Sequence, residues 1–412
     1  MSPSRFFLLA LLVLPAGARA APTLTLDRAL SLALDQNPGL LALQSEVAAS
    51  RARLEGASLL LQSNPELEGA AGPRSTAGTR GTDFSVTLSQ RLELFGQRAA
   101  RSDASRALLG SAQARFAARR VEIAAEVREG FGRWLGARQR DRIAAEALDL
   151  ARQALAAAET RQAAGAASRI EVNASRAVLG RAARERSAAA LRLASARAGF
   201  LLLLGLDPAE PAEPEGQLAL DAPGPEVATD TLVQLALSQR PELQAARLEV
   251  DAASAEHRLA GREALPNPRL GISYAEESDP ANPARITQAI LAFDLPLFNR
   301  NQAARGVAAA RQQQAARALD ALTRSVRAEV ALAASRLASA QAAAQAYAGG
   351  LLSGLEENMQ LVTEAYRAGK VNFFELLVIR RETLEARNGY VDALEELLAA
   401  KAGLSRAIGS IP

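Results

Sequence analysis

A strand that leads directly into a very long helix constrains this chain more than any other feature. Within Thr82–Gly96, apolar residues alternate with small polar ones, the pattern of a β-strand with one apolar face. The proline-free stretch that follows, to about Ala164, has helical periodicity and as one helix would be roughly 100 Å long. Such a pair predicts a wall that crosses a membrane as sheet and continues beyond it as helix.

The same plan occurs twice along the sequence. Asn64-Pro65 recurs as Asn267-Pro268, and Ala164-Gly165 recurs as Ala368-Gly369. Chance similarity between alanine-rich helices would not preserve the spacing of these Asn-Pro and Ala-Gly pairs, so we expect an internal duplication. The chain then divides into a first repeat over residues 21–206, a linker over 207–226 that is rich in Pro, Glu and Gly, and a second repeat over 227–412.

Each repeat contributes two predicted strands, at about 66–71 and 82–95 and again at about 269–275 and 286–297. Four strands are too few to close a barrel, and an open sheet edge in lipid leaves backbone groups without partners. We therefore expect several chains to share one barrel, with three chains giving twelve strands and a lumen. The alternative is a water-soluble antiparallel sheet that buries its apolar face.

The helical parts carry apolar residues at gaps of three and four, the spacing of coiled coils. We expect one long helix to end near Ala164 and a second to run from about Asn299 to Ala368, each followed by a glycine turn and a returning helix. Apolar residues make up 49% of the chain but aromatic residues only 4%, which favours closely packed alanine-rich helices over a large globular core.

Residues 1–20 predict a secretory signal peptide. Arg5 precedes the apolar run Phe6–Leu14, and Ala18-Arg19-Ala20 is a small-residue cleavage site. The run is too short for a retained membrane helix. The net charge is only +3 and both signs are interspersed, so the composition predicts no nucleic-acid partner.

Motifs of known chemistry are missing from the sequence. There is no cysteine, which excludes a disulfide framework and a thiolate metal site. The single histidine, His257, has no second ligand near it in sequence, and neither a P-loop nor an HExxH motif is present. We predict a protein that is not an enzyme and that has no cofactor and no bound metal.

The order of these features resembles the TolC family of outer-membrane efflux proteins. Two helices, a strand pair, a very long helix, a glycine turn and a returning helix follow the signal peptide, and the set is duplicated. The stretch Leu88–Arg98, LSQRLELFGQR, resembles the strand-to-helix junction of the heavy-metal (CzcC-like) branch of that family.

The resemblance implies a homotrimer in the outer membrane of a Gram-negative cell, with a twelve-stranded β-barrel continued by a periplasmic α-helical barrel. It implies a passive channel that docks to a periplasmic adaptor (membrane fusion) protein and an inner-membrane pump of the RND type, and that carries heavy-metal cations of the cobalt-zinc-cadmium type. A drug-efflux or type I secretion channel is the alternative with the same fold. A secreted coiled-coil scaffold without a pore is an alternative of another class.

The resemblance also implies that the two glycine turns form a periplasmic gate. Matching the family's turns onto this sequence gives three constriction residues, Glu375, Glu171 and Tyr366, and four residues of the tip turns and adaptor-docking surface, Gly165, Gly369, Ala164 and Ala368. The alternative is that these residues have purely structural roles. An acid in the first turn of a helix interacts favourably with the helix dipole, and Tyr366 could pack within the coiled coil.

Overall fold

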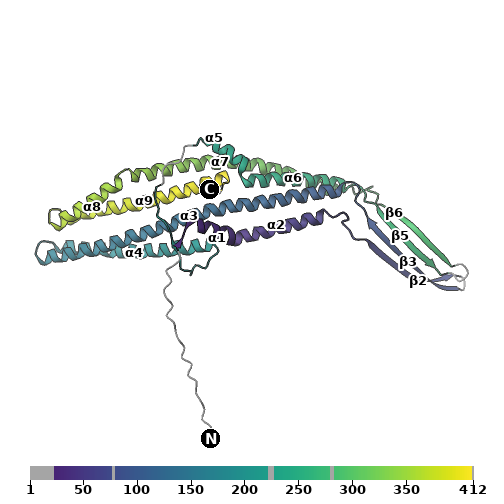
Figure 1. The fold of residues 1–412 in the computed structure, drawn as a ribbon, viewed down its shortest axis with the longest axis horizontal. Coiled ribbons are helices and arrows are strands. Elements are labelled where there is room, and N and C mark those ends of the chain that lie inside the picture. The colour runs from purple at the N-terminus through teal and green to yellow at the C-terminus, as the bar shows by residue number, and fades with distance from the viewer. Residues whose placement is uncertain (1–22, 77–78, 221–226, 279–282, 411–412) are drawn as a thin grey trace, which may run out of the picture.

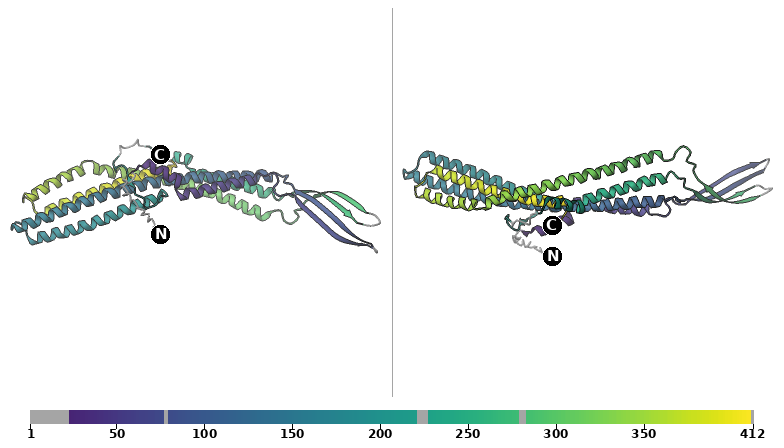
Figure 2. Two further views of the ribbon diagram at one scale, coloured as in Figure 1. Left: turned by 60° about the horizontal axis from the view of Figure 1, so that its bottom comes forward. Right: turned by 90° about the horizontal axis from the view of Figure 1, so that it is seen from above.

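The computed structural model describes residues 23–76, 79–220, 227–278 and 283–410. The predicted signal peptide lies outside these residues, as do residues 221–226 of the predicted linker. The molecule is elongated, with a four-stranded sheet at one end, the turns of two helical hairpins at the other, and the C-terminus near the middle (Figures 1 and 2).

Between residues 23 and 220, in the described part of the chain, four helices precede the end of the predicted linker: α1 (Leu26–Gln36), α2 (Pro38–Ala57), α3 (Gln97–Ala163) and α4 (Arg169–Leu203). Asn37 separates α1 from α2, and its Oδ1 atom accepts a hydrogen bond from the backbone N–H of Gly39 at 2.9 Å. An asparagine cap followed by proline is a strong helix start, because proline has no N–H to leave unpaired. The 67-residue helix α3 spans most of the helical part (Figure 1).

Among the residues described after the linker there are five helices: α5 (Thr229–Gln239), α6 (Pro241–Arg262), α7 (Gln302–Ala348), α8 (Leu351–Arg367) and α9 (Phe373–Ile408). The expectation of one unbroken helix from Asn299 to Ala368 is wrong, because the helix breaks at Gly349 and Gly350. Gly350 has φ +99°, a conformation that disfavours side-chain-bearing residues, and glycine is a poor helix former. Since α3 has no such pair, only one of the two hairpins is interrupted.

Beyond the helices, the strands β2 (Glu66–Thr76), β3 (Thr79–Arg91), β5 (Arg269–Glu277) and β6 (Ala284–Ala292) form one antiparallel sheet in the order β2-β3-β5-β6. The hairpin β2–β3 is longer at its tip than predicted, and Pro73 fits there because β2 is an edge strand. The predicted strand ends at residues 95 and 297 are wrong, because β3 ends at Arg91 and β6 ends at Ala292. β6 ends before Pro296, which has no backbone N–H to donate to a neighbouring strand.

The sheet register gathers apolar side chains on one face. Leu67 pairs with Leu88, and Leu88 pairs with Ile272; these three residues are 71%, 52% and 63% exposed. On the opposite face the Thr87 hydroxyl donates to Ser273 Oγ at 3.1 Å. The alternative of a sheet that buries its apolar face within the chain is therefore wrong.

The main hydrophobic core lies where the two halves meet, around Trp134 of α3. It includes Phe131 and Phe200, and it extends to Leu394 of α9 and Leu218 of the predicted linker. The linker also contains a short strand, β4 (Glu213–Pro214), which pairs in parallel with β1 (Thr23–Leu24). Residues 207–220 are thus folded against the helices.

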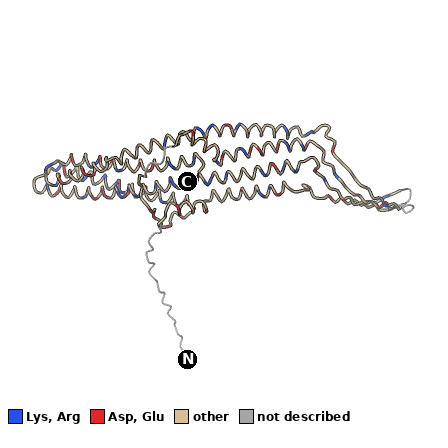
Figure 3. Tube along the Cα trace, turned by 45° about the horizontal axis from the view of Figure 1, so that its top comes forward, with Lys and Arg blue, Asp and Glu red and all other residues tan. Residues whose placement is uncertain are grey.

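Charges are interspersed along the helices, as Figure 3 shows. Among the described residues, no helix combines the length and the apolar character needed to cross a membrane.

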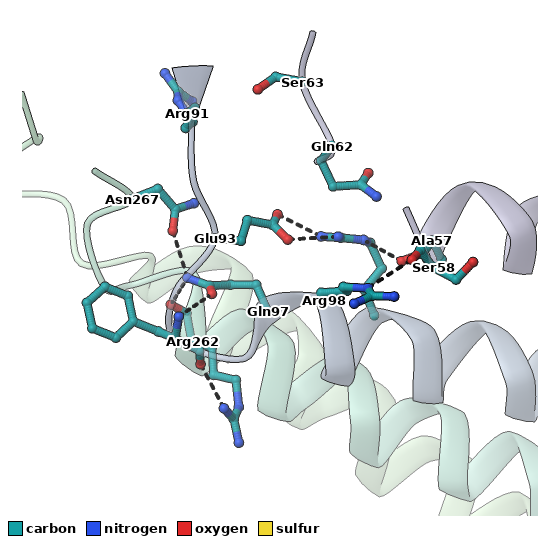
Figure 4. A network of polar contacts seen from close by, with 12 residues as sticks. Ala57, Ser58, Gln62, Ser63, Arg91, Glu93, Gln97, Arg98, Arg262 and Asn267 are labelled. Carbon is teal, nitrogen blue, oxygen red and sulfur yellow. Dashed lines mark hydrogen bonds and ion pairs between the residues drawn. The ribbon is translucent and has the colours of Figure 1, made fainter. Parts of the chain in front are cut away.

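The junction between β3 and α3 is held by a buried amide, the Gln97 side chain, which is 1% exposed. Its Oε1 atom accepts from the backbone N–H of Phe95 at 2.9 Å, and its Nε2 atom donates to Asn267 Oδ1 at 2.9 Å and to the Arg262 carbonyl at 3.3 Å. Gly96, with φ +76°, makes the turn between β3 and α3. Figure 4 shows Gln97 between Asn267 and Arg262, so this one side chain ties the start of α3 to the other half of the chain.

Two arginines of α3 anchor the same junction to the end of α2. Arg101 forms a bidentate ion pair with Glu93, with N–O distances of 2.9 and 2.8 Å. This is the strongest arrangement of a guanidinium and a carboxylate. Arg98 donates to the carbonyl of Ser58 at 2.9 Å. These contacts fix the direction in which the sheet leaves the helices.

We expect Gln97→Ala to lower the free energy of unfolding by about 1–3 kcal/mol, because it leaves the part-buried Asn267 amide oxygen and the Phe95 N–H without a partner. The measurement is denaturant unfolding of the full chain in detergent. Gln302 is the matched control, since it makes the equivalent local bond to the Arg300 N–H at 2.8 Å but is exposed. Equal losses for Gln97→Ala and Gln302→Ala would contradict the special role of the buried amide.

Candidate functional site at the hairpin tips

Glycine turns end α3 and α8 in the same way. Gly165 and Gly369 have φ +73° and +74°. The N–H of the next residue in each turn, Ala166 or Lys370, donates at 2.8 Å to a carbonyl five residues back. This is the Schellman geometry, which requires a left-handed residue and therefore favours glycine. The predicted tip residues Ala164 and Ala368 sit beside these glycines, and all four are exposed.

Each returning helix begins with a polar cap and an acid three residues later. Ser168 Oγ accepts from the Glu171 N–H at 3.2 Å, and Asn372 Oδ1 accepts from the Glu375 N–H at 3.0 Å. The Asn372 amide also donates to Glu375 Oε1 at 2.7 Å. Both acids thus lie in the first turn of a helix, where a negative charge is favourable.

A direct hydrogen bond joins the two hairpins. The Tyr366 hydroxyl, at the end of α8, donates to Glu171 Oε1, at the start of α4, at 2.7 Å. Arg161 of α3 completes the group: its Nη1 atom is 3.7 Å from Glu171 Oε1, and its guanidinium lies 4.9 Å from the centre of the Tyr366 ring. The positive charge of Arg161 is therefore attracted both to the face of the Tyr366 ring and to the Glu171 carboxylate.

Tyr366 is 2% exposed and packs with Phe373 and Leu376 in a small apolar cluster at the tips. Burial raises the pKa of Tyr366 to about 12, and its hydrogen bond to Glu171 contributes in the same direction. Arg161 opposes the shift. The phenol therefore remains a neutral hydrogen-bond donor at physiological pH.

The structure brings together two of the three predicted constriction residues, Tyr366 and Glu171. It does not place Glu375 with them, since Glu375 is exposed and its side chain bonds to Asn372 of its own turn. Arg161 is a member of the group that the sequence reasoning missed. Its position in the last turn of α3, next to Gly165, is the signal that could have indicated it.

We expect the tyrosinate absorbance of Tyr366 to appear late in an alkaline titration. The pKa of Tyr366 is raised from 10.0 to about 12, so its stabilising contribution is complete below pH 10 and is lost as the pH rises through about 12. The measurement is the difference between the titrations of the wild-type protein and the Tyr366→Phe variant. A difference that titrates near pH 10 would show that the phenol is not buried against Glu171.

A metal centre is not part of this group. Within the described ranges, no three or more His, Asp or Glu residues are placed to hold a metal ion. What the tips can do is hold two hairpins together through one buried, charge-assisted hydrogen bond.

Comparisons with known proteins agree with this architecture. The model of the outer membrane efflux protein family matches residues 29–206 and 232–410. The cobalt-zinc-cadmium resistance protein CzcC of Cupriavidus metallidurans is 31% identical over 95% of this chain and 91% of its own length. The protein CyaE of Bordetella pertussis is 28% identical over 81% of this chain and 72% of its own.

Solved structures share the fold. The crystal structure of CusC superposes with a TM-score of 0.79 at 23% identity, covering 97% of this chain and 95% of that one. These matches confirm the resemblance to the TolC family and rule out a pore-free secreted scaffold. The chain belongs to the outer membrane efflux protein family: it is not an enzyme, and it lies in the outer membrane and extends into the periplasm.

Proposed function

We propose that three copies of this chain close one channel through the outer membrane. The observation that carries this proposal is the open sheet: β2 and β6 each have one strand neighbour, and the apolar face is exposed. In lipid an open edge leaves backbone groups unpaired. Three copies would join these edges into a twelve-stranded barrel, and the helices would continue it as an α-helical barrel.

The proposed assembly rests on two repeats in each chain, at residues 21–206 and 227–412. Both halves have two shorter helices, a strand hairpin, a long helical arm and a returning helix in the same order, although the arm of the second half is divided into α7 and α8. The family model also matches one range in each half. Two similar halves per chain would give the trimer an approximately even wall of helices.

In this proposal the channel is the passive component of a tripartite efflux system, in which an inner-membrane pump of the RND type supplies the energy. A periplasmic adaptor would dock at the tip turns around Gly165 and Gly369. Both glycines are exposed, and a side-chain atom added there would meet no other atom within 4 Å. The turns are thus accessible to a partner.

The proposed cargo is heavy-metal cations of the cobalt-zinc-cadmium type. The support is the 31% identity to a cobalt-zinc-cadmium resistance protein across nearly the whole chain. A drug-efflux or type I secretion channel with the same fold is the alternative. The chain is also 27% identical to the outer membrane protein OprJ of Pseudomonas aeruginosa and 28% identical to CyaE, whose names specify no metal.

Purification in detergent, followed by mass measurement and planar-bilayer conductance, tests the channel. We expect a particle of three chains that conducts ions. A monomer, or a trimer without conductance, would contradict the proposal.

The cargo is tested in the source bacterium by deleting the gene. We expect increased sensitivity to zinc, cobalt and cadmium and unchanged sensitivity to hydrophobic drugs, with the plasmid-borne gene restoring resistance. Sensitivity to drugs alone would favour the alternative.

The proposed constriction includes a ring of three Glu375 carboxylates around the trimer axis, which would attract cations. We expect Glu375→Gln, which keeps the acceptor for Asn372, to weaken divalent-cation block of the channel by about tenfold. Single-channel recording measures the block. Glu364→Gln, at an exposed position of α8, is the control; equal effects of the two substitutions would show that Glu375 has no special place.

A further inference from the structure

A cavity of about 690 Å³ lies on the hairpin half of the molecule, between α3, α4 and α9. Part of its lining is apolar and comes from all three helices, for example Ile143, Val178 and Leu377. The rest is charged. A cavity of this size, with an apolar lining and a few convergent charges, is typical of a site for a small organic molecule.

The charges of the lining do not balance. The cavity is lined by six arginines and three acids, and each acid forms an ion pair with one of these arginines: Glu185 with Arg192, Glu385 with Arg381, and Asp392 with Arg140. Three arginines of the lining remain without a carboxylate partner among the described residues, namely Arg181, Arg184 and Arg380.

Arg380 is the decisive residue, because it is only 7% exposed. Its guanidinium donates to the carbonyl of Ala147 on α3, and among the described residues no carboxylate forms an ion pair with it. Burial lowers the pKa of Arg380, but a guanidinium stays charged in proteins. A buried charge without a counter-charge is costly, so this position is one where an anion would be stabilising.

We propose that the cavity binds an organic anion, with its carboxylate, sulfonate or phosphate head on Arg380 and its apolar body against the apolar lining. A guanidinium presents two parallel N–H donors that match the oxygens of such a head group. Arg181 and Arg184 add long-range attraction from α4. The excess positive charge disfavours a metal cation here. The site goes beyond the proposed channel function and does not depend on the cargo.

Isothermal titration of the full-length protein in detergent tests this site, with naphthalene-2-sulfonate as the probe and naphthylmethylammonium as the matched cation. We expect the anion to bind and the cation not to bind. Arg380→Gln should weaken binding of the anion by about 10- to 100-fold, the effect of losing charge-assisted hydrogen bonds. Arg381→Gln removes a charge at the adjacent, exposed and ion-paired position, and should weaken binding less than about fivefold.

Thermal unfolding provides the second measurement. Naphthalene-2-sulfonate should raise the unfolding temperature of the wild-type protein and of Arg381→Gln, but not that of Arg380→Gln. If Arg380→Gln does not fold, Arg184→Gln, at an exposed position of α4, still tests the site by a smaller loss of affinity. Equal binding of the anion and the cation, or anion binding that neither Arg380→Gln nor Arg184→Gln reduces, would overturn the proposal. Inorganic phosphate that binds as tightly as the probe would overturn the role of the apolar lining.

Discussion

Replacing Trp134 by alanine is expected to lower the free energy of unfolding by about 3–5 kcal/mol, the cost of truncating a large buried aromatic residue. Trp134 is 1% exposed. Its ring centre is 5.4 Å from that of Phe200 on α4 and 6.5 Å from that of Phe131 on α3. These contacts lie in the core that joins the two halves of the chain, so truncation of the indole leaves a cavity there.

Denaturant unfolding of the full chain in detergent measures this loss. Leu191→Ala is the control, since Leu191 lies on α4 but is 68% exposed, and its truncation should change the free energy by no more than about 0.5 kcal/mol. Trp134→Phe should fall between the two. A loss below about 1 kcal/mol for Trp134→Ala would mean that this core does not hold the halves together.

Removing the hydroxyl of Tyr366 is expected to loosen the contact between the two hairpin tips. The hydrogen bond from Tyr366 to the charged Glu171 stabilises the arrangement in which the two tips are in contact. Its loss should therefore raise the open probability of the proposed channel by about 10- to 100-fold. Single-channel recording of Tyr366→Phe measures this. Because Tyr366 and Glu171 form the two sides of one bond, Glu171→Gln should have a similar effect, and the double variant should add little.

The control for this prediction is an exposed ion pair on the same hairpin. Glu159 contacts Arg176 at 3.0 Å, and the two side chains are 47% and 61% exposed. Exposed pairs of this kind contribute little. Glu159→Gln should therefore leave the open probability unchanged. Additive effects of Tyr366→Phe and Glu171→Gln would show that the two residues act separately.

Local sequence signals predicted the tip geometry well. The left-handed turns at Gly165 and Gly369 follow from glycine placed after a helix, and Glu171 and Glu375 lie in the first turns of the returning helices. The caps of these helices, Ser168 and Asn372, were found only in the structure. The contact between Tyr366 and Glu171 could not be derived from spacing, because it depends on how two hairpins far apart in sequence pack together. Arg161 was missed for the same reason.

The spacing of apolar residues and the positions of glycine and proline determined most of the local structure of this chain. They specified a sheet with one apolar and one polar face, very long helices, and two halves of similar plan. These signals depend on neighbours in sequence, so they are visible without the fold. The break at Gly349 and Gly350 also has a local cause, a pair of glycines, although it was not predicted from the sequence. Only the tertiary structure decided which amide holds the junction at Gln97 and which arginine is buried without a carboxylate at Arg380. Each of these depends on contacts between helices, and the energy of a buried polar group is set by partners that sequence order does not specify.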